Sequence, residues 1–472
     1  MRETIKATYI DGKFIEPHGR EVMQSINPAN GTVIGDVTLA DETDTKQAIA
    51  AAKRALPTFS RTTKEERIEI LRRMHKAVTA HIDDLTAAMV LEYGGTRSFS
   101  SLMVQGAAEV FRQAEIALNN IEFVRTWGTT RVFYEPVGVA GLITPWNANT
   151  LFLCIKSAAA FSAGCPVVIK PSELSALQTQ TLLECLQEAK LPPGIFNVVT
   201  GRGEVVGAEL VRNPDVSKIS FTGSAPVGQS IMRDGAATMK RVTLELGGKS
   251  PNILLDDADL STAIPNALII GWMNSGQACA AGTRLLVPKK RLEEVKKALI
   301  ATVPSFPVGE PSDPKTAVGP MVSKKQFERV QSLIQRGIDE GAEVLVGGVG
   351  HPKGLEGGNF VKPTIFVNVD NNMTIAQEEI FGPVLSVIAY DDEEDAIRIA
   401  NDTKYGLYGF VSGKDAERAR RVGSRILAGR VAINGLLDDQ QAPFGGFKHS
   451  GFGREFGTFG IEAYLEPRAI LG

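Results

Sequence analysis

The sequence predicts an α/β protein built on a parallel, doubly wound sheet, and three observations lead to that class. Between residues 138 and 245, short runs rich in Val, Ile and Phe alternate with stretches whose apolar residues have helical spacing. The same alternation restarts after residue 245. A length of 472 residues allows about three folding units, and a hydrophobic share of 43% is enough to fill their cores.

The elements can be placed in chain order. Two helical stretches rich in Ala, Glu and Arg, at 40–56 and 63–113, come first, and we expect Pro57 to end the earlier one. Residues 123–134 are strand-like and predict a hairpin that leaves the body. In the first alternating region the expected strands are GVAGLITP, PVVIK, IFNVVTG, KISFTG and RVTLEL, and the expected helices span 151–163, 176–189, 204–211 and 227–236.

A second α/β unit follows. Residues 260–283 carry no formal charge and are long enough to cross a bilayer by the rule of about 20 residues. Their Pro265, Asn274 and Gln277 favour a buried site over lipid. The expected strands of this unit are SPNILLD, RLLVP, EVLVGG, TIFVNV, VLSVIAY and RVAIN, and its expected helices span 292–302, 324–340, 395–401 and 414–427.

Composition excludes several classes of protein. The formal net charge is −3, which argues against a broad nucleic-acid or membrane-binding surface. Four cysteines are too few for a disulfide scaffold in so long a chain. The opening MRETIKATYIDGKF has neither the apolar segment of a secretory signal nor an arginine-rich transit character. We therefore expect a cytoplasmic protein in a reducing compartment.

Glycine-rich loops are the first candidate ligand sites. Three patterns compete, in GRGEVVG, FTGSAPVG and PFGGF, and none is the full G-x-G-x-x-G fingerprint. FTGSAPVG is the best placed, because Gly223 ends a strand and Val227 opens a helix whose free N–H groups would face an anion. A tight turn explains each pattern equally well when it stands alone.

A charged pair follows the strand PVVIK. Lys170 and Glu173 would lie at the carboxyl end of that strand, where open α/β sheets bind ligands. Lys170 can donate to ribose hydroxyls, whereas Glu173 can accept from a ribose 2′-hydroxyl and would repel a 2′-phosphate. The alternative is a solvated ion pair at the start of a helix.

Cys279 is the candidate nucleophile. It lies in NSGQACAAGTR, where small neighbours permit close approach of a substrate, and a thiolate there could attack an electrophilic carbon. None of the five histidines falls in a motif that indicates a Cys–His pair. The alternative is an inert buried cysteine, the interpretation given to Cys154, Cys165 and Cys185.

Two further polar residues are candidates for the same chemistry. Glu245, in LELGGKS, ends an apolar strand, and burial would raise its pKa toward the range suited to taking a proton from water. Its alternative is a core glutamate paired with Lys249. Asn147, in LITPWNAN, lies at a strand end, where its amide could donate to an oxyanion or serve as a turn residue.

Seven motifs together resemble one family. The segments TPWN (144–147), KPSE (170–173), FTGS (221–224), LELGGKSP (244–251), GQAC (276–279), EEIFGPV (378–384) and PFGGFKHSGFGRE (443–455) occur in the order and spacing of the aldehyde dehydrogenase superfamily. The sequence is similar to NAD(P)-dependent, non-phosphorylating members over essentially the whole chain, and the spacing of LELGGKSP and GQAC is the most specific part of the likeness.

The resemblance implies roles for individual residues. Cys279 matches the nucleophile of the family, Glu245 the general base and Asn147 the oxyanion donor. No metal ligand is expected. The implied cofactor contacts are Lys170 and Glu173 at the adenosine ribose, Gly223 and Ser224 at the pyrophosphate, Val227 at the adenine, Glu379 and Phe381 at the nicotinamide ribose, and Thr144 and Trp146 along the cleft.

The resemblance also implies an architecture and a reaction. The fold would be a Rossmann-type cofactor domain (1–117 and 137–246), an α/β catalytic domain (247–445) and a small β oligomerisation element (118–136 and 446–472). The reaction would oxidise an aldehyde to the acid with NAD, NADP being less favoured, through a cysteine thiohemiacetal and a thioester. A homodimer or homotetramer is implied.

Two alternatives and one departure remain. A CoA-acylating dehydrogenase would transfer the acyl group of the thioester to CoA. The resemblance implies, however, that such enzymes lack a glutamate at the position of Glu245. A cofactor-free cysteine hydrolase leaves KPSE and Glu379 unexplained. The departure is Ala148, at a position often aromatic in the family, which together with Asp438 and Asp439 in the loop 435–442 predicts a roomy pocket with an acidic rim.

Overall fold

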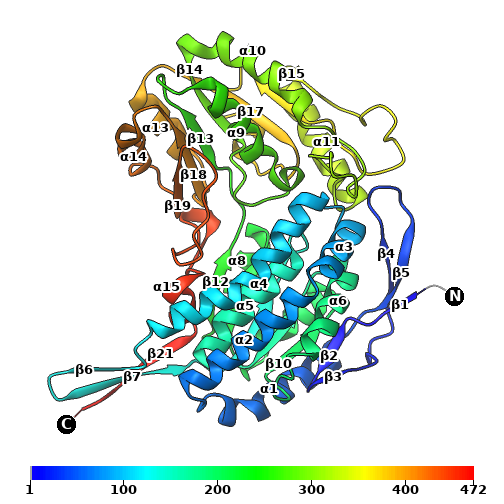
Figure 1. Cartoon of the computed structure of the whole chain (residues 1–472), viewed down its shortest axis with the longest axis vertical. Helices are drawn as coiled ribbons and strands as arrows, with labels where there is room; N and C mark the ends of the chain where they lie inside the picture. Colours follow the sequence, from blue (N-terminus) through cyan, green and yellow to red (C-terminus); the bar gives the residue numbers. More distant parts are fainter. Residues whose placement is uncertain (1–2, 472) are drawn as a thin grey trace.

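Two large sheets divide the chain into two lobes. The computed structural model describes residues 3–471, and Figure 1 shows one lobe built around β13, β17 and β18 above another built around the helices α1 to α8. A thin arm made of β6, β7 and β21 projects from the lower lobe. The predicted α/β class is confirmed, and each lobe contains one of the two alternating regions.

The sheet of the lower lobe has eight strands in the order β20-β12-β11-β8-β9-β10-β2-β3. Its five central strands pair in parallel and coincide with the five strands expected between residues 138 and 245. Their segments are almost wholly buried because helices cover both faces. The strands are β8 (Val139–Ile143), β9 (Val167–Lys170), β10 (Phe196–Val199), β11 (Val216–Thr222) and β12 (Arg241–Glu245), with antiparallel edges from β20 (Gly451–Phe452), β2 (Thr8–Ile10) and β3 (Lys13–Phe14).

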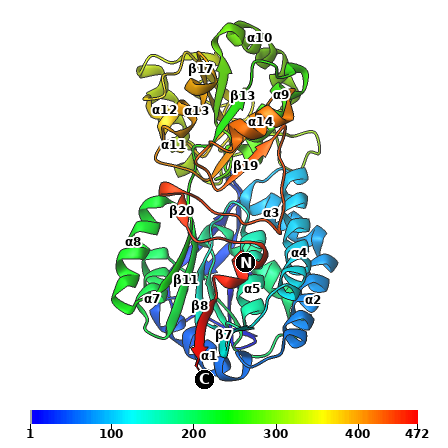
Figure 2. The same ribbon diagram turned by 90° about the vertical axis from the view of Figure 1, so that its left-hand side faces the viewer.

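The helices form one layer on each face of this sheet, as the side view shows (Figure 2). One layer packs an apolar cluster from its helices against β8 and β9, and the other packs against β10 and β11. The first layer is α2 (Lys64–Ala80), α3 (Ile82–Tyr93), α4 (Arg97–Asn119), α5 (Asn149–Ala163) and α6 (Ala176–Gln187), and the second is α1 (Glu42–Phe59), α7 (Ala208–Arg212) and α8 (Ala225–Gly235).

The expectation that Pro57 ends the first helix was wrong. Helix α1 continues through Pro57 to Phe59. Pro57 lacks the N–H that would donate to the carbonyl of residue 53, but its fixed φ is compatible with a helix. Phe59 is 3% exposed and makes an edge contact with Phe161, the ring centroids being 5.6 Å apart. Burial of that ring offsets the lost bond.

The sheet of the upper lobe has seven strands in the order β15-β16-β17-β14-β13-β18-β19, all parallel except β15. Six were expected, and the central β18 (Tyr408–Ser412) was missed because its sequence, YGFVS, has no clear alternation. The others are β13 (Pro251–Leu254), β14 (Arg284–Pro288), β15 (Glu343–Val346), β16 (Thr364–Val367), β17 (Val384–Tyr390) and β19 (Arg430–Ile433). The helices include α9 (Leu260–Trp272), α10 (Leu292–Thr302), α11 (Lys324–Asp339), α12 (Thr374–Gln377), α13 (Glu393–Asn401) and α14 (Ala416–Gly423).

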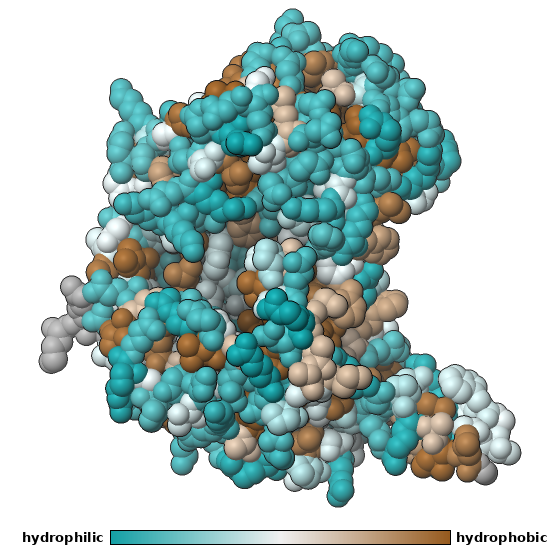
Figure 3. Space-filling model, turned by 180° about the vertical axis from the view of Figure 1, so that it is seen from behind, coloured by the Kyte–Doolittle hydropathy of each residue, from teal (hydrophilic) through white to brown (hydrophobic). Residues whose placement is uncertain are grey.

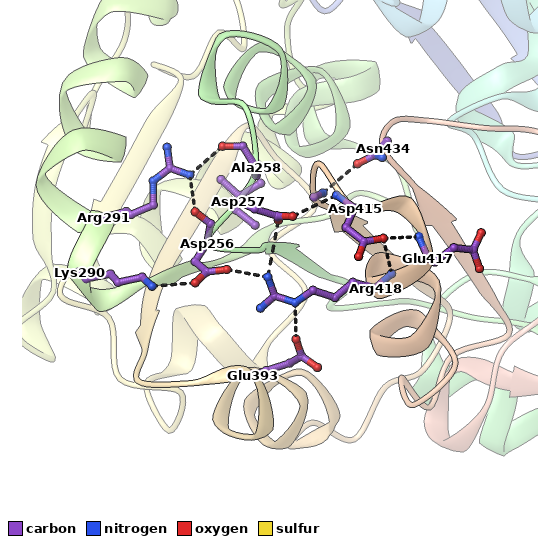
Figure 4. Close-up of polar contacts among 12 residues, drawn as sticks. Asp256, Asp257, Ala258, Lys290, Arg291, Glu393, Asp415, Glu417, Arg418 and Asn434 are labelled. Atoms are coloured by element: carbon purple, nitrogen blue, oxygen red, sulfur yellow. Dashed lines mark hydrogen bonds and ion pairs between the residues drawn. The ribbon is translucent and has the colours of Figure 1, made fainter.

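A charged cluster joins the end of β13 to two helices of this lobe (Figure 4). Arg418 of α14 places Nη1 2.7 Å from Asp256 and Nε 2.8 Å from Glu393 at the start of α13. Lys290 binds the other carboxylate oxygen of Asp256 at 2.7 Å. These contacts hold the pKa of Asp256 at about 2, chiefly through the hydrogen bonds from Lys290 and Arg418.

The arm is a three-stranded antiparallel sheet that combines two distant segments. The expected hairpin forms β6 (Val124–Trp127) and β7 (Thr130–Pro136), and β21 (Leu465–Ile470) pairs with the other edge of β7. Apolar side chains gather on the arm in the rear view (Figure 3), where Trp127 is 64% exposed. Both outer strands leave unpaired backbone edges.

Two findings concern segments that the sequence left open. A separate sheet near the amino terminus, β1 (Glu3–Ile5), β5 (Val33–Thr38) and β4 (Val22–Ile26), was not expected, because its strands are short and their apolar residues alternate weakly. The uncharged stretch 260–283 forms α9 and then an irregular turn. Within residues 3–471, none of the helices has the length and apolar character needed to cross a membrane.

Candidate active site

The site lies where the winding of the lower sheet reverses. From β8 the chain proceeds to β9 and β10 on one side, and from the adjacent β11 it proceeds to β12 on the other. Such a switch point leaves a crevice at the carboxyl ends of the strands. Two cavities, of about 760 and 720 Å³, open there and share Trp146, Gly223 and Ser224 in their walls. Together they form one elongated cleft.

The 720 Å³ cavity contains the predicted phosphate loop. Thr144, Lys170, Gly223, Ser224 and Val227 all line it. Ser224 precedes α8 without using its side chain to cap the helix, so the first N–H groups of α8 are available to an anion. Val227, 48% exposed, offers an apolar wall. The position is that of the FTGSAPVG pattern favoured above the other glycine loops.

The predicted charged pair lies at the edge of this cavity. Lys170 Nζ is 2.9 Å from Oε2 of Glu173, and Lys170 itself lines the cavity. Burial of the carboxyl opposes ionisation, but the attraction and hydrogen bond of Lys170 outweigh it and lower the pKa of Glu173. The pair is therefore largely buried rather than solvated, with Lys170 only 5% exposed.

Cys279 lines the 760 Å³ cavity, and a tight loop presents it there. Asn274 and Ser275 have left-handed backbones, with φ of 52° and 56°, which is strained for residues with a side chain. At Gly276, with φ of 74°, a Cβ would lie 2.0 Å from the carbonyl oxygen of Gly382. The loop that carries Cys279 thus requires glycine at this position.

The electrostatic surroundings of Cys279 differ from those of a preformed thiolate. Burial raises the pKa of Cys279 to about 12, and the charges of Glu379 and Glu245 add to that effect. The cysteine is therefore a thiol at neutral pH when the cleft contains the protein's own groups alone. The other three cysteines are buried, as expected of inert residues.

Glu245 ends β12 and lines the same cavity. It is 2% exposed, and among the described residues neither carboxyl oxygen has a hydrogen-bond partner. Burial, reinforced by the charge of Glu455, raises the pKa of Glu245 well above its usual value. Lys249 does not pair with it, because the Lys249 amine also has no partner in the part of the chain described. The alternative of a paired core glutamate is thus not observed.

The Asn147 amide is held in the wall of this cavity. Its Nδ2 donates to the carbonyl of Gln277 at 2.9 Å, which leaves a second N–H free for a ligand. Asn274 donates to the carbonyl of Asn147 at 2.9 Å and accepts from the Tyr93 hydroxyl at 2.8 Å. The contact between Tyr93 and Asn274 could not be predicted from the sequence, since a hydrogen bond across 181 positions depends on the tertiary fold.

The predicted Glu379 and Phe381 lie across the cleft from the sheet. Oε1 of Glu379 accepts from the backbone N–H of Gly248 at 3.0 Å, and burial raises its pKa to about 7. Phe381 has a left-handed φ of 61° and makes an edge contact with Trp146, the ring centroids being 5.4 Å apart. All three side chains line the 760 Å³ cavity.

Several wall residues were missed. Gln326 donates to the carbonyl of Phe381 at 2.8 Å and Arg329 to that of Glu379 at 2.9 Å. Their spacing of three on α11 was the available signal. His449 also lines the cavity, as do Lys404 and Tyr405.

An elongated cleft at a switch point, with a cysteine and an unpaired buried glutamate at one end, defines a cysteine-dependent oxidoreductase of the nucleotide-binding α/β class. A family model described as "Aldehyde dehydrogenase family" matches residues 14–470. The chain belongs to the aldehyde dehydrogenase family.

Similar proteins support this assignment. A 3-succinoylsemialdehyde-pyridine dehydrogenase from a Pseudomonas species is 44% identical over 466 residues, 98% of each chain. The structure of a cysteine-to-alanine mutant of AldC from Pseudomonas syringae, in complex with NAD+ and octanal, has a TM-score of 0.97 at 43% identity, covering 99% of this chain and 96% of the other. Betaine aldehyde dehydrogenase from Staphylococcus aureus, solved with NAD+, has a TM-score of 0.96 at 36% identity, covering 99% and 94%.

The family, the fold class and the aldehyde-oxidising activity predicted from the sequence are confirmed. Neither the CoA-acylating nor the cofactor-free alternative is favoured by these relatives.

Proposed function

We propose that this enzyme oxidises an aldehyde to the carboxylic acid with NAD, using Cys279 as nucleophile, Asn147 as oxyanion donor and Glu245 as general base. One observation carries the assignment of roles. Cys279, Asn147 and Glu245 line the same 760 Å³ cavity, and Glu245 keeps both carboxyl oxygens free of protein partners within residues 3–471. A buried base with no ion pair can accept a proton from water.

The residues along the cleft fit a dinucleotide. A Cβ added at Gly203 would meet no atom within 4 Å, so the space beside this glycine is open. The Thr144 hydroxyl is buried without a partner among the described residues. Lys170 and Glu173 would hold the adenosine ribose, Gly223 and Ser224 the pyrophosphate, Val227 the adenine, and Glu379 and Phe381 the nicotinamide ribose, with Thr144 and Trp146 along the cleft. When bound, the nicotinamide supplies the hydride acceptor.

The protein's own groups then carry the covalent steps. The Cys279 sulfur adds to the carbonyl carbon, its proton leaves to a base or water, and the free N–H of Asn147 stabilises the resulting oxyanion. Loss of hydride leaves a thioester on Cys279. Glu245 takes a proton from water, the hydroxide attacks the thioester, and the acid departs as the Cys279 sulfur is released.

The preference for NAD over NADP rests on Glu173. Its carboxylate can accept from a 2′-hydroxyl, a charge-assisted bond on the order of 1.5–3 kcal/mol. The same carboxylate would repel a 2′-phosphate. The AldC and betaine aldehyde dehydrogenase structures that contain NAD+ support the choice of nicotinamide.

Aldehydes with an uncharged chain are the proposed substrates. Phe152 lines the same cavity as Cys279, and Ala148 is a small residue directly after Asn147 of the cavity wall. Asp438 binds Arg430 at 3.0 Å, so the rim is less acidic than its sequence indicates. The AldC structure with octanal supports an aliphatic chain of this kind.

The assembly, the location and the domain boundaries are also proposals. The exposed edges and apolar side chains of the arm support a homodimer or homotetramer. Strand membership supports cofactor (1–117 and 137–246), catalytic (247–445) and oligomerisation (118–136 and 446–472) parts, except that β20, within the last range, pairs with β12 of the cofactor sheet. The cysteine content supports a cytoplasmic location.

An aldehyde panel tests the proposed function. Octanal, shorter and longer homologues, and a cationic aldehyde are assayed by the absorbance of the reduced nicotinamide, with NAD and with NADP. We expect turnover with NAD to be fastest for the uncharged chains. Absence of turnover with every aldehyde, with NAD and with NADP, would refute the proposal.

A further inference from the structure

A second cation lies next to Glu173 of the Lys170–Glu173 pair. Arg202, which follows β10, places Nη1 3.5 Å from Oε1 of Glu173. Lys170 Nζ is 2.9 Å from the other oxygen, Oε2. Each carboxylate oxygen therefore has its own cation, and both cations contribute to the lowered pKa of Glu173. None of the roles implied by the sequence uses Arg202.

Arg202 is fixed from its other side by Glu21. Its Nε and Nη2 both donate to Oε1 of Glu21, at 3.0 and 2.7 Å. The corner thus holds two cations and two carboxylates, and its formal charge is balanced while Glu173 is ionised. The Arg202 side chain remains 33% exposed, and the neighbouring Gly203 lines the cavity. The Arg202 side chain is thus partly open to solvent directly beside a residue that lines the cavity.

We propose that Arg202 is a second determinant of cofactor choice: it holds Glu173 in place for the 2′-hydroxyl of NAD, and it is the cation that binds a 2′-phosphate once Glu173 is neutral. The inference rests on the proposed NAD-dependent function. A monoester phosphate carries about −1.5 to −2 charge at pH 7. While Glu173 is ionised, its carboxylate repels the 2′-phosphate. When the negative charge of Glu173 is removed, Lys170 and Arg202 face the phosphate together.

The two cations differ in what they offer a phosphate. A guanidinium presents a planar fork of donors that can bind two phosphate oxygens, whereas an ammonium acts as a point charge. Lys170 is also the deeper of the two, at 6% side-chain exposure, and its place on β9 lets it serve the ribose of either nicotinamide. Selection for the phosphate therefore falls on Arg202.

The test is a double-mutant cycle on cofactor choice. Glu173→Gln, Arg202→Ala and the double variant are assayed in the full-length enzyme for kcat/KM with NAD and with NADP. We expect Glu173→Gln to raise kcat/KM with NADP by about ten-fold, through KM and not kcat. In the Arg202→Ala background the same substitution should give less than about three-fold. Dissociation constants of both nicotinamides in a Cys279→Ala background provide a readout that is independent of turnover.

Arg212 offers a matched control. It lines the same cavity, but it pairs with Asp234 at 2.9 Å and not with Glu173. Arg212→Ala in the Glu173→Gln background should therefore keep the gain with NADP. The part of the gain that depends on Arg202 should also shrink as ionic strength rises, because the guanidinium is partly exposed.

The outcomes separate this inference from the function it rests on. An equal gain with and without Arg202, or no gain from Glu173→Gln, would overturn the role of Arg202 while the enzyme remained an NAD-dependent dehydrogenase. Loss of the gain in Arg212→Ala would likewise overturn it, since a general positive potential would then be the cause. Wild-type enzyme inactive with both nicotinamides would instead refute the proposed function.

Discussion

Cys279 and Glu245 face the same cavity, where burial, then the charge of Glu379 and then that of Glu245 raise the pKa of the Cys279 thiol. Neither side chain has a cation in direct contact within the described chain. The site therefore favours the protonated form of both its nucleophile and its base until a ligand changes their surroundings. A positive charge brought next to Cys279 would favour the reactive form of the cysteine.

Cys279→Ala should abolish dehydrogenase turnover, by at least about 10³-fold, because no other side chain in the cavity can form the thioester. Binding of NAD should change little, since the contacts proposed for the nucleotide lie elsewhere along the cleft. Steady-state kinetics and a nucleotide titration check the two halves. Turnover close to that of the wild type would exclude a covalent mechanism at Cys279.

Glu245→Gln should slow hydrolysis of the thioester more than its formation. We expect a burst of NADH near one equivalent per active site and then a steady rate lower by about 10²-fold, the usual contribution of a general base. Stopped-flow absorbance resolves the phases. If the burst and the steady rate fell together, Glu245 would act before hydride transfer, for instance on the thiol.

The stability of Glu245→Gln should depend on pH. When a carboxyl group has a higher pKa in the folded than in the unfolded state, the folded protein becomes less stable as pH rises above the unfolded pKa, which is about 4.3 for glutamate. The glutamine variant should therefore be more stable than the wild type at pH 8, by about 1–3 kcal/mol for a buried unpaired carboxylate, and nearly equal to it at pH 4. Thermal unfolding at both values checks this, and a variant no more stable at pH 8 would show that water or a cation already satisfies the carboxylate.

Asp256→Asn should show the opposite dependence. The pKa of Asp256 is lowered to about 2 by Lys290 and Arg418, so its stabilising effect is present above about pH 4 and disappears as pH falls through about 2. We expect a loss of about 1 kcal/mol at pH 7, small because the cluster is partly exposed. Urea unfolding at pH 7 and pH 3 measures it. A matched control is Asp391→Asn, whose partner Lys289 lies 3.3 Å away on an open surface.

The sequence predicts the parts of this molecule that depend on local pattern. Strands such as VVIK in β9 are buried on both faces and are recognisable from composition alone. The strand β18 and the sheet formed by β1, β4 and β5 were missed because their residues alternate weakly and gain burial from distant neighbours. The residues predicted for the catalytic and cofactor sites all line one cleft except Glu173, which contacts Lys170 in the wall of that cleft.

What the sequence could not supply is the electrostatic state of the site. The pKa of Cys279 depends on Glu245 from β12 and on Glu379 from the other lobe, and no local pattern places those charges together. The support of Asn147 by Asn274 and Tyr93 is equally non-local. Arg202 was hidden for the same reason, because its contact with Glu173 appears when β9 and β10 pair.

Mass spectrometry of acid-quenched enzyme detects directly whether the aldehyde becomes a thioester on Cys279. Glu245→Gln is mixed with excess octanal and NAD, quenched after the burst, digested and analysed. We expect the peptide containing Cys279 to gain the mass of the aldehyde less two hydrogen atoms, in an amount that matches the NADH released, and Cys279→Ala to show neither. A full equivalent of NADH with an unmodified Cys279 peptide would contradict this expectation.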